Sequence, residues 1–168
     1  EVLEILPKVG ALGLTPVMNP TGEMISEDDQ QWLIKVTQEA GVNIVSDEVY
    51  LDAAKGTGFY RPMYKMALNS ISINSLTKTY GLGPIRFGWM IGEPKLIQNA
   101  KNAFQNMQGL ASAPTVSIAE TVFPRLDEAL DGIWEARKQN LPKLLEVLEA
   151  HGIQWTPPPF GIYGAFSI

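Results

Sequence analysis

The chain has 168 residues, of which 45% are hydrophobic and 18% are charged, and its formal net charge is -5. This composition is that of an ordinary globular domain with a buried core. The acidic balance argues against a nucleic-acid surface, which needs clustered Lys and Arg, and no segment approaches the ~20 apolar residues that span a bilayer. The absence of cysteine excludes disulfides, thiolate nucleophiles and sulfur-ligated metals, and it fits a reducing cytoplasm. We expect no metal site, because His151, the single histidine, lies where a helix should end.

The N-terminal part of the chain predicts a strand, a turn and a helix. Residues 11–17 form a short apolar run that ends at the turn sequence Asn19-Pro20-Thr21-Gly22. Ser26 is the predicted N-cap of a helix, because acidic residues follow it in the first turn and an apolar stripe with helical spacing comes next. Gly41 is the predicted end of this helix.

The rest of the chain predicts three more strands and three more helices. The strands are expected at residues 42–46, 70–74 and 87–91, and the helices at 94–107, 116–126 and 127–150. Pro124 and Pro142 should bend the second and third of these helices. Strands that alternate with helices predict an α/β fold with an at least partly parallel sheet, which collects ligands at the carboxyl ends of its strands.

The first polar cluster at such a strand end is Asp47-Glu48-Val49-Tyr50. A carboxylate directly after an apolar strand should be partly desolvated and should favour a cationic partner. Taken alone, Asp47 also fits a solvated acid that begins a turn, and Tyr50 fits a packed aromatic side chain with a hydrated hydroxyl.

The second cluster is Ser75-Leu76-Thr77-Lys78, which is followed by a glycine-rich stretch that contains Arg86. A desolvated lysine can lose its proton near neutral pH and attack a carbonyl group. Hydroxyls at Ser75 and Thr77 can meet a phosphate, and the planar guanidinium of Arg86 can clamp it. Taken alone, Lys78 is better interpreted as a surface loop lysine and Arg86 as a salt-bridge partner.

Four short motifs in register carry more information than any one of them. They are Asn19-Pro20-x-Gly22, Asp47-x-x-Tyr50, Ser75-x-x-Lys78 and Arg86-x-Gly88. Their order resembles that of the class I/II aminotransferases, which are fold-type-I enzymes of the aspartate aminotransferase superfamily that use pyridoxal 5′-phosphate. The resemblance runs from about residue 11 to the end, although the distinctive motifs occupy only residues 19–89.

The resemblance implies a role for each matched residue. Lys78 would form a Schiff base with the cofactor and then carry the proton between the substrate Cα and the cofactor C4′. Asp47 would pair with the pyridine nitrogen, and Tyr50 and Asn19 would hydrogen-bond the 3′ oxygen of the ring. The phosphate would be held by Ser75, Thr77 and Arg86.

The resemblance also implies a fold and a domain division. The four strands would lie side by side in a mostly parallel sheet with helices on both faces, and the last strand would be antiparallel to the one that leads into Lys78. Residues 1–150 would be part of the cofactor-binding large domain, including the long interdomain helix. Residues 151–168 would begin the small C-terminal domain.

Parts of the expected site have no counterpart in the sequence. They are the preceding phosphate-binding loop, the aromatic residue that stacks on the ring, and the small-domain arginine that binds the substrate carboxylate. Arg61, Arg125 and Arg137 do not occupy that motif. The chain starts at Glu1 without an initiator Met, and residues 164–168 read as the middle of a strand. We therefore expect a fragment of a longer protein that binds the cofactor weakly or not at all and is inactive alone. We also expect it to self-associate or to lack a complementary chain.

Transamination between an amino acid and a 2-oxo acid is the leading function, and two alternatives remain. One is another reaction on the same cofactor, such as that of a β-lyase, a decarboxylase or a synthase. The other is an aminotransferase-like effector-sensing domain of a transcription regulator. The resemblance further implies a homodimer, with residues 109–114 near the neighbouring site, and the expected partners include neither nucleic acid nor membrane.

Overall fold

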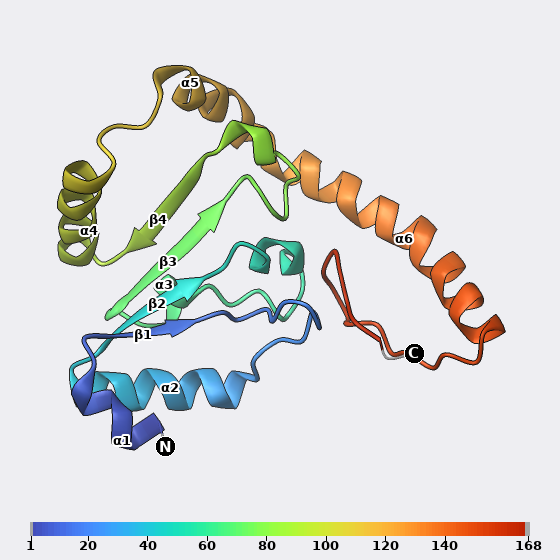
Figure 1. Cartoon of the computed structure of the whole chain (residues 1–168), viewed down its shortest axis with the longest axis horizontal. Helices are drawn as coiled ribbons and strands as arrows, with labels where there is room; N and C mark the ends of the chain where they lie inside the picture. Colours follow the sequence, from blue (N-terminus) through green and yellow to red (C-terminus); the bar gives the residue numbers. More distant parts are fainter. Residues whose placement is uncertain (1, 167–168) are drawn as a thin grey trace.

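A four-stranded sheet forms the centre of the fold, and the computed structural model describes residues 2–166 around it (Figure 1). The strands lie side by side in the order β1 (Ala11–Leu14), β2 (Asn43–Asp47), β3 (Ser70–Ser75) and β4 (Gly88–Gly92). The first three are parallel, and β4 is antiparallel to β3. The predicted α/β class, strand order and antiparallel fourth strand are therefore confirmed.

Six α-helices accompany the sheet in the described part of the chain. They are α1 (Val2–Ile5), α2 (Glu27–Ala40), α3 (Met63–Met66), α4 (Pro94–Met107), α5 (Ala113–Val122) and α6 (Leu126–Ala150). Short 3-10 turns are η1 (Leu6–Lys8), η2 (Leu51–Ala54), η3 (Gly83–Ile85) and η4 (Phe123–Arg125). Figure 1 shows α1 and α2 beside β1, and α4 and α5 beyond β4.

Local capping signals explain where the best-predicted helices begin and end. The Ser26 hydroxyl accepts a hydrogen bond from the Asp29 N–H at 3.0 Å, which caps α2 as expected. The helix ends at Gly41, whose φ of 68° is left-handed and suits glycine. Pro94 opens α4, where its missing N–H costs no helical hydrogen bond.

Several predicted boundaries differ from the observed ones. Strand β1 ends at Leu14, short of the predicted residue 17, because Pro16 has no N–H to continue a ladder. Helix α5 begins at Ala113, because Pro114 is tolerated in a first turn. Residues 164–166 of the strand predicted at 164–168 are not a strand, and the remaining two lie outside the described residues.

The core is divided among clusters that tie the helices and loops to the sheet. On one side, Ile34 of α2 and Met63 of α3 pack against the fully buried Ile44 of β2. A second cluster joins the loop after β3 to α5 and α6 and contains Leu76, Tyr80, Ala119, Leu126 and Leu130. The second cluster holds in place the loop that follows the carboxyl end of β3.

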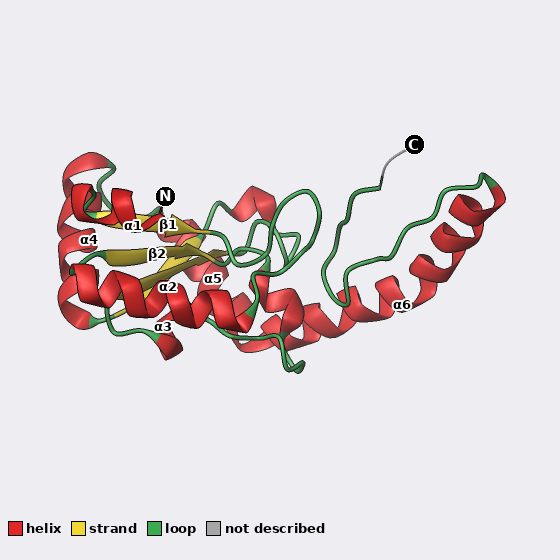
Figure 2. Ribbon diagram, turned by 90° about the horizontal axis from the view of Figure 1, so that it is seen from below, coloured by secondary structure: helices red, strands yellow, loops and turns green. Residues whose placement is uncertain are grey.

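The segment after α6 returns to the loops at the carboxyl end of the sheet. Figure 2 shows α6 extending away from the sheet, with the C-terminal segment running beside it. Phe160 of this segment is only 1% exposed and packs with Val17, Leu51 and Ala54. The returning segment is therefore part of the walls around the loops that follow the strands.

Candidate functional site

The parallel pairing of β2 and β3 brings two of the predicted site residues to the same edge of the sheet. Asp47 is the last residue of β2 and is paired with Ile73 of β3. Lys78 follows the end of β3 at Ser75 by three residues. A carboxylate and an amine from separate segments therefore meet at the carboxyl ends of adjacent strands, where α/β sheets bind ligands.

A cavity of about 1130 Å³ opens at this edge and joins four predicted residues. Its walls include Asn19, Asp47, Tyr50 and Lys78. The Asn19 amide donates a hydrogen bond to the Tyr50 hydroxyl at 3.4 Å, which links the turn after β1 to the loop after β2. We call this space the strand-end cavity.

The turn that carries Asn19 requires glycine at its fourth position. Gly22 has a φ of 74°, and a Cβ atom there would lie 2.8 Å from Cγ of Pro158 and 2.9 Å from the Tyr163 carbonyl oxygen. A larger residue would push the turn away from the returning C-terminal segment. The glycine of the first motif thus keeps Asn19 against this wall of the strand-end cavity.

Two side chains expected to be desolvated are instead exposed. Asp47 and Lys78 both lie on the open side of the strand-end cavity, and Asp47 Oδ1 accepts a hydrogen bond from the Val49 N–H at 3.3 Å. The partial desolvation expected for Asp47 is not observed, because side chains alternate along the chain here: Ser46 and Glu48 are buried, and Asp47 lies on the other side. The buried acid is the next residue, Glu48, which accepts hydrogen bonds of 2.7 Å from the Met63 N–H and the Ser72 hydroxyl. Burial raises the pKa of Glu48 above its usual value.

The three residues predicted to hold a phosphate form a separate group beside the lysine loop. The Ser75 hydroxyl accepts a hydrogen bond from the Thr77 N–H at 3.3 Å. Ser75 is paired with Gly88 in the antiparallel ladder, and Arg86 lies two residues before that glycine. The ladder therefore places Arg86 near Ser75 and the Thr77 that follows it. None of them is among the residues that line the strand-end cavity.

Arg86 has an unusual backbone and a free side chain. It ends η3 with a φ of 53°, which is uncommon for a residue other than glycine. Its side chain is exposed, and within residues 2–166 its guanidinium makes neither a hydrogen bond nor an ion pair with the protein. The planar fork is therefore available for an anion such as a phosphate.

A buried polar network, which the sequence analysis missed, holds the loop that carries Lys78. Asp52 of η2 accepts hydrogen bonds from the Asn74 amide at 3.0 Å and the Tyr80 hydroxyl at 2.5 Å. Lys55 donates to the same hydroxyl at 3.4 Å. Burial and the Asp52 carboxylate raise the pKa of Tyr80, which keeps the hydroxyl protonated as a donor. The only sequence signal for this network was the closeness of Asn74 and Tyr80 to Lys78.

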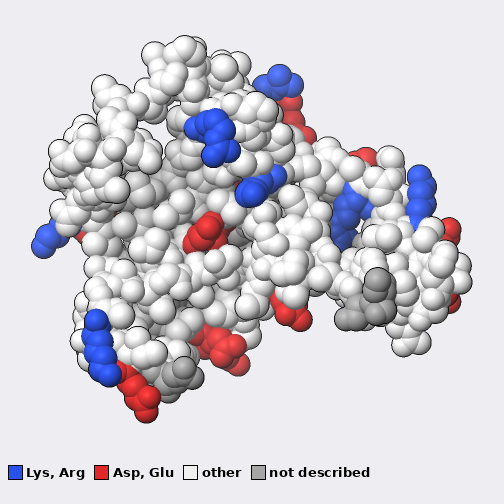
Figure 3. Space-filling view, viewed as in Figure 1, with Lys and Arg blue, Asp and Glu red and all other residues white. Residues whose placement is uncertain are grey.

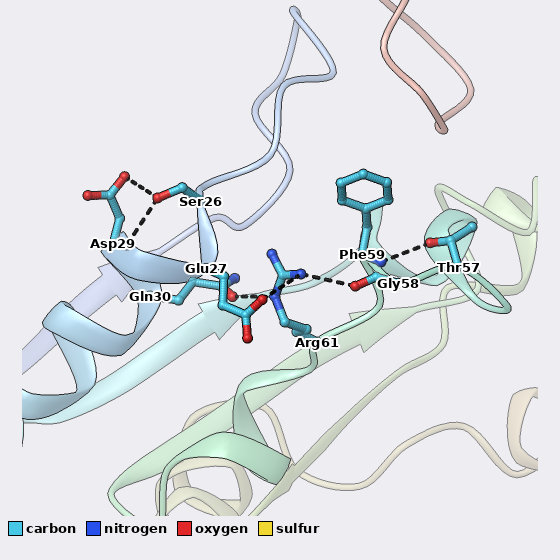
Figure 4. Close-up of polar contacts among 8 residues, drawn as sticks. All are labelled: Ser26, Glu27, Asp29, Gln30, Thr57, Gly58, Phe59 and Arg61. Carbon is cyan, nitrogen blue, oxygen red and sulfur yellow. Dashed lines mark hydrogen bonds and ion pairs between the residues drawn. The ribbon is translucent and has the colours of Figure 1, made fainter.

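A further wall of the strand-end cavity is anchored by Arg61 (Figure 4). Its Nε donates to the Gln30 side chain at 3.1 Å and its Nη1 to the Gly58 carbonyl at 3.0 Å, with Glu27 at 3.7 Å as an ion-pair partner. This fixes the loop after η2, from which Phe59 lines the cavity. Arg61 therefore acts as a brace between that loop and α2.

Lys78 also lines a second cavity, of about 690 Å³, between its loop, α6 and the C-terminal segment. Arg137 of α6 lies in its wall and donates to the carbonyls of Gly161, at 3.2 Å, and Pro158. Tyr163 lines the same cavity and packs edge-on against Tyr50 at 4.5 Å between ring centroids. We call this space the α6 cavity. Nothing in the local sequence pattern indicated that α6 reaches Lys78.

The side chains gathered around Lys78 fit the cofactor that the resemblance implies. A carboxylate, an amine and paired amide and hydroxyl groups line one cavity, and an unpaired guanidinium with hydroxyls lies beside the lysine loop. These groups match the ring nitrogen, aldehyde, ring oxygen and phosphate of pyridoxal phosphate. In the described part of the chain, no three His, Asp or Glu side chains are placed to hold a metal ion.

On the face drawn in Figure 3, Lys and Arg are scattered and form no continuous basic patch. No helix among residues 2–166 has the length and apolar character needed to cross a bilayer.

Comparison with known proteins places these features in a family context. Residues 3–165 match the family described as aminotransferase class I and II. The aspartate aminotransferase of Thermococcus kodakarensis is 28% identical over 88 residues, which are 52% of this chain and 24% of that protein. A putative threonine-phosphate decarboxylase of Caldanaerobacter subterraneus is 28% identical over 100 residues, or 58% of this chain and 27% of that protein. The chain thus spans only about a quarter of the length of these relatives.

The fold comparison agrees over most of the chain. The crystal structure of a PLP-dependent aminotransferase from Streptococcus suis superposes with a TM-score of 0.78 at 22% identity. The match covers 89% of this chain and 41% of that structure. At this level of identity the similarity establishes the fold, and that fold is the one implied by the four motifs.

Proposed function

Because this chain belongs to the aminotransferase class I and II family, we propose that it is the cofactor-holding part of a pyridoxal-phosphate-dependent aminotransferase. The enzyme would move an amino group between an amino acid and a 2-oxo acid. The observation that carries the proposal is that Asn19, Asp47, Tyr50 and Lys78 line one cavity at the carboxyl ends of β2 and β3. When bound, pyridoxal phosphate supplies the aldehyde that takes up the amino group and the ring that accepts electrons from Cα.

Each residue has a defined task in this proposal. Lys78 Nζ would bind the aldehyde carbon of the cofactor with loss of water. Once the amino group of the substrate had displaced it, the free Lys78 amine would carry the proton from the substrate Cα to C4′. The Asp47 carboxylate keeps a proton on the ring nitrogen by charge attraction. Tyr50 and Asn19, which already hydrogen-bond each other, hold the ring oxygen. Ser75, Thr77 and Arg86 bind the phosphate through hydroxyls and the unpaired guanidinium.

We also propose how the protein divides into domains and which oligomer it forms. Residues 1–150 belong to the cofactor-binding domain, and residues 151–168 begin a second, smaller domain. We propose that the chain alone is inactive. Two observations support this: Asp47 and Lys78 are exposed, and the matched part of the chain covers only 24% of the aspartate aminotransferase from Thermococcus kodakarensis. From the family resemblance we further propose a cytoplasmic homodimer as the working enzyme.

Borohydride trapping tests the central claim without requiring turnover. The chain is incubated with pyridoxal phosphate, reduced with borohydride and digested, and each lysine is scored by mass spectrometry. We expect labelling to concentrate on Lys78 and to be weaker elsewhere. Asp47→Asn should reduce labelling of Lys78, whereas Lys65→Ala, a change of an exposed lysine outside both cavities, should leave it unchanged. Uniform labelling of all lysines would refute the proposed function.

A second reaction on the same cofactor is favoured by one observation. The relative from Caldanaerobacter subterraneus bears the name of a putative decarboxylase and matches this chain about as well as the aspartate aminotransferase does. Product analysis of the parent enzyme separates the two reactions. Transamination converts the cofactor to its pyridoxamine form, whereas decarboxylation releases carbon dioxide from the amino acid.

A further inference from the structure

One face of the sheet is closed by helices. Side chains alternate between the two faces along a strand, so the pairing of β2 with β3 shows which residues share a face. The closed face carries Ile44, Ser46, Ser70, Ser72 and Asn74, and each of them is at most 7% exposed. Helices α2 and α3 pack on this side, around Ile44. We call it the covered face.

The opposite face has no buried side chain within residues 2–166. The ladder registers place Val45, Asp47, Ile71, Ile73 and Met90 together on it, and we call it the open face. All five are partly or fully exposed, and none of the four apolar ones belongs to a core cluster of the described chain. Helix α4, which follows β4, contributes no buried residue either.

The residue types on the two faces are the reverse of what a solvated face requires. The covered face of β2 and β3 carries mostly serine and asparagine, whereas the open face carries Val45, Ile71 and Ile73. A face of a sheet that stays in water is normally the polar one. Exposed apolar patches of this kind mark interaction surfaces. The open face therefore has the composition of a layer that another element covers.

The winding of the chain explains why its own helices leave this face open. The strands β1, β2 and β3 follow one another in a single direction across the sheet. Crossovers between parallel strands are right-handed, so two successive crossovers in one direction place their helices on the same face. A parallel sheet nevertheless has helices on both faces. The cover must therefore come from a segment outside this winding, and the chain covers only 41% of the Streptococcus suis structure that shares its fold.

From this arrangement we propose that the open face docks an amphipathic α-helix from another polypeptide segment, whose apolar stripe packs on Val45, Ile71 and Ile73. Asp47 lies on the same face, two residues after Val45, so the docked helix also limits the access of water to this carboxylate. The docking surface exists whatever reaction occurs at Lys78.

A designed peptide tests the docking surface on the whole chain. The probe is about 18 residues long, or five helical turns, with leucine and alanine at helical spacing and lysine and glutamine elsewhere. The control peptide has the same composition in an order without helical spacing. We expect only the probe to bind, as measured by fluorescence anisotropy, and to gain helix on binding. Ile73→Lys should weaken its binding at least about tenfold, because an apolar contact is lost and a charge is buried.

A second variant and a matched control locate the binding. Met90 is 38% exposed, so Met90→Lys leaves the core intact and should also weaken binding. Val147 is an apolar residue of α6 that is 56% exposed, and Val147→Lys should leave binding unchanged. Because the chain contains no cysteine, Met90→Cys carries a single thiol. The probe should slow the reaction of this thiol with a maleimide, and it should not slow that of Val147→Cys.

The outcomes distinguish a helix from other occupants of the open face. Equal binding of the two peptides, or equal effects of Met90→Lys and Val147→Lys, overturns the proposal. Sedimentation velocity tests for a second copy: a dimer that Met90→Lys abolishes, in a chain that does not bind the probe, would also overturn it. Selective protection of the Met90→Cys thiol supports the docking surface even if borohydride trapping at Lys78 fails, so this proposal and the proposed function can fail separately.

Discussion

The hydroxyl of Tyr80 offers a direct test of the network that holds the lysine loop. Tyr80 is 5% exposed, and its hydroxyl donates to Asp52 at 2.5 Å and accepts from Lys55 at 3.4 Å. Tyr80→Phe keeps the ring in its core cluster and removes both hydrogen bonds. Asp52, itself 5% exposed, would keep the hydrogen bond from the Asn74 amide.

The expected cost follows from the charge and burial of Asp52. A hydrogen bond to a charged group contributes about 1.5–3 kcal/mol, and water cannot easily replace a lost donor at this depth. We therefore expect Tyr80→Phe to lower the free energy of unfolding by about 1.5–3 kcal/mol. Tyr64→Phe, at a tyrosine whose hydroxyl makes no hydrogen bond within residues 2–166, should change it by less than about 0.5 kcal/mol.

Urea unfolding at pH 7, followed by circular dichroism, measures these differences. Asp52→Asn and the Asp52→Asn, Tyr80→Phe double variant complete a double-mutant cycle. Because the hydroxyl acts through the carboxylate, the two changes should be non-additive by about 0.5–3 kcal/mol. Equal effects of Tyr80→Phe and Tyr64→Phe, or strict additivity in the cycle, would show that this network does not stabilise the loop.

Two further changes test the pH dependence and the sheet. Because the pKa of Glu48 is raised in the folded state, the folded protein binds this proton more tightly than the unfolded chain does. The free energy of unfolding of the wild type, relative to that of Glu48→Gln, should therefore fall as the pH rises from about 4.5. Urea unfolding of both proteins between pH 4 and pH 8 measures this, and a parallel pH dependence of the two would contradict the assignment. At Gly92 of β4 an added Cβ would lie 2.5 Å from the Ser70 carbonyl oxygen, so Gly92→Ala should cost about 1–3 kcal/mol. Its control is Gly132→Ala in α6, where a Cβ meets nothing within 4 Å, and it should stabilise the chain by up to about 1 kcal/mol in the same assay. A neutral Gly92→Ala would mean that the β3–β4 contact is looser than described.

The elements that the sequence predicted best are those with local signals. Helix α2 runs from the Ser26 cap to Gly41, and α4 begins at Pro94, because caps and proline act on the turn that contains them. Strands β2 and β3 were also predictable from short β-branched runs. Their order and the antiparallel direction of β4 came from the family resemblance, which residue patterns alone do not supply.

The candidate site was likewise predicted only in part from the sequence. Motifs behind predicted strands, together with the family resemblance, singled out Asp47 and Lys78 as candidate site residues. They were expected near each other because parallel strands end at one edge of a sheet. Only the tertiary structure showed that both side chains are exposed while Glu48 is buried, since solvent access depends on which distant segments cover a strand end.

The structure alone also brought Arg137 and Tyr163 to the cavity beside Lys78. These residues lie more than fifty positions along the chain from Lys78, and no local pattern relates them to it. They meet because α6 leads the chain away from the sheet and Phe160 then packs into the core beside Leu51. The sequence by itself therefore predicted the candidate reactive groups and the elements that carry them. Long-range packing decided what surrounds those groups, because burial, hydrogen-bond partners and cavity shape depend on segments that are distant in the sequence.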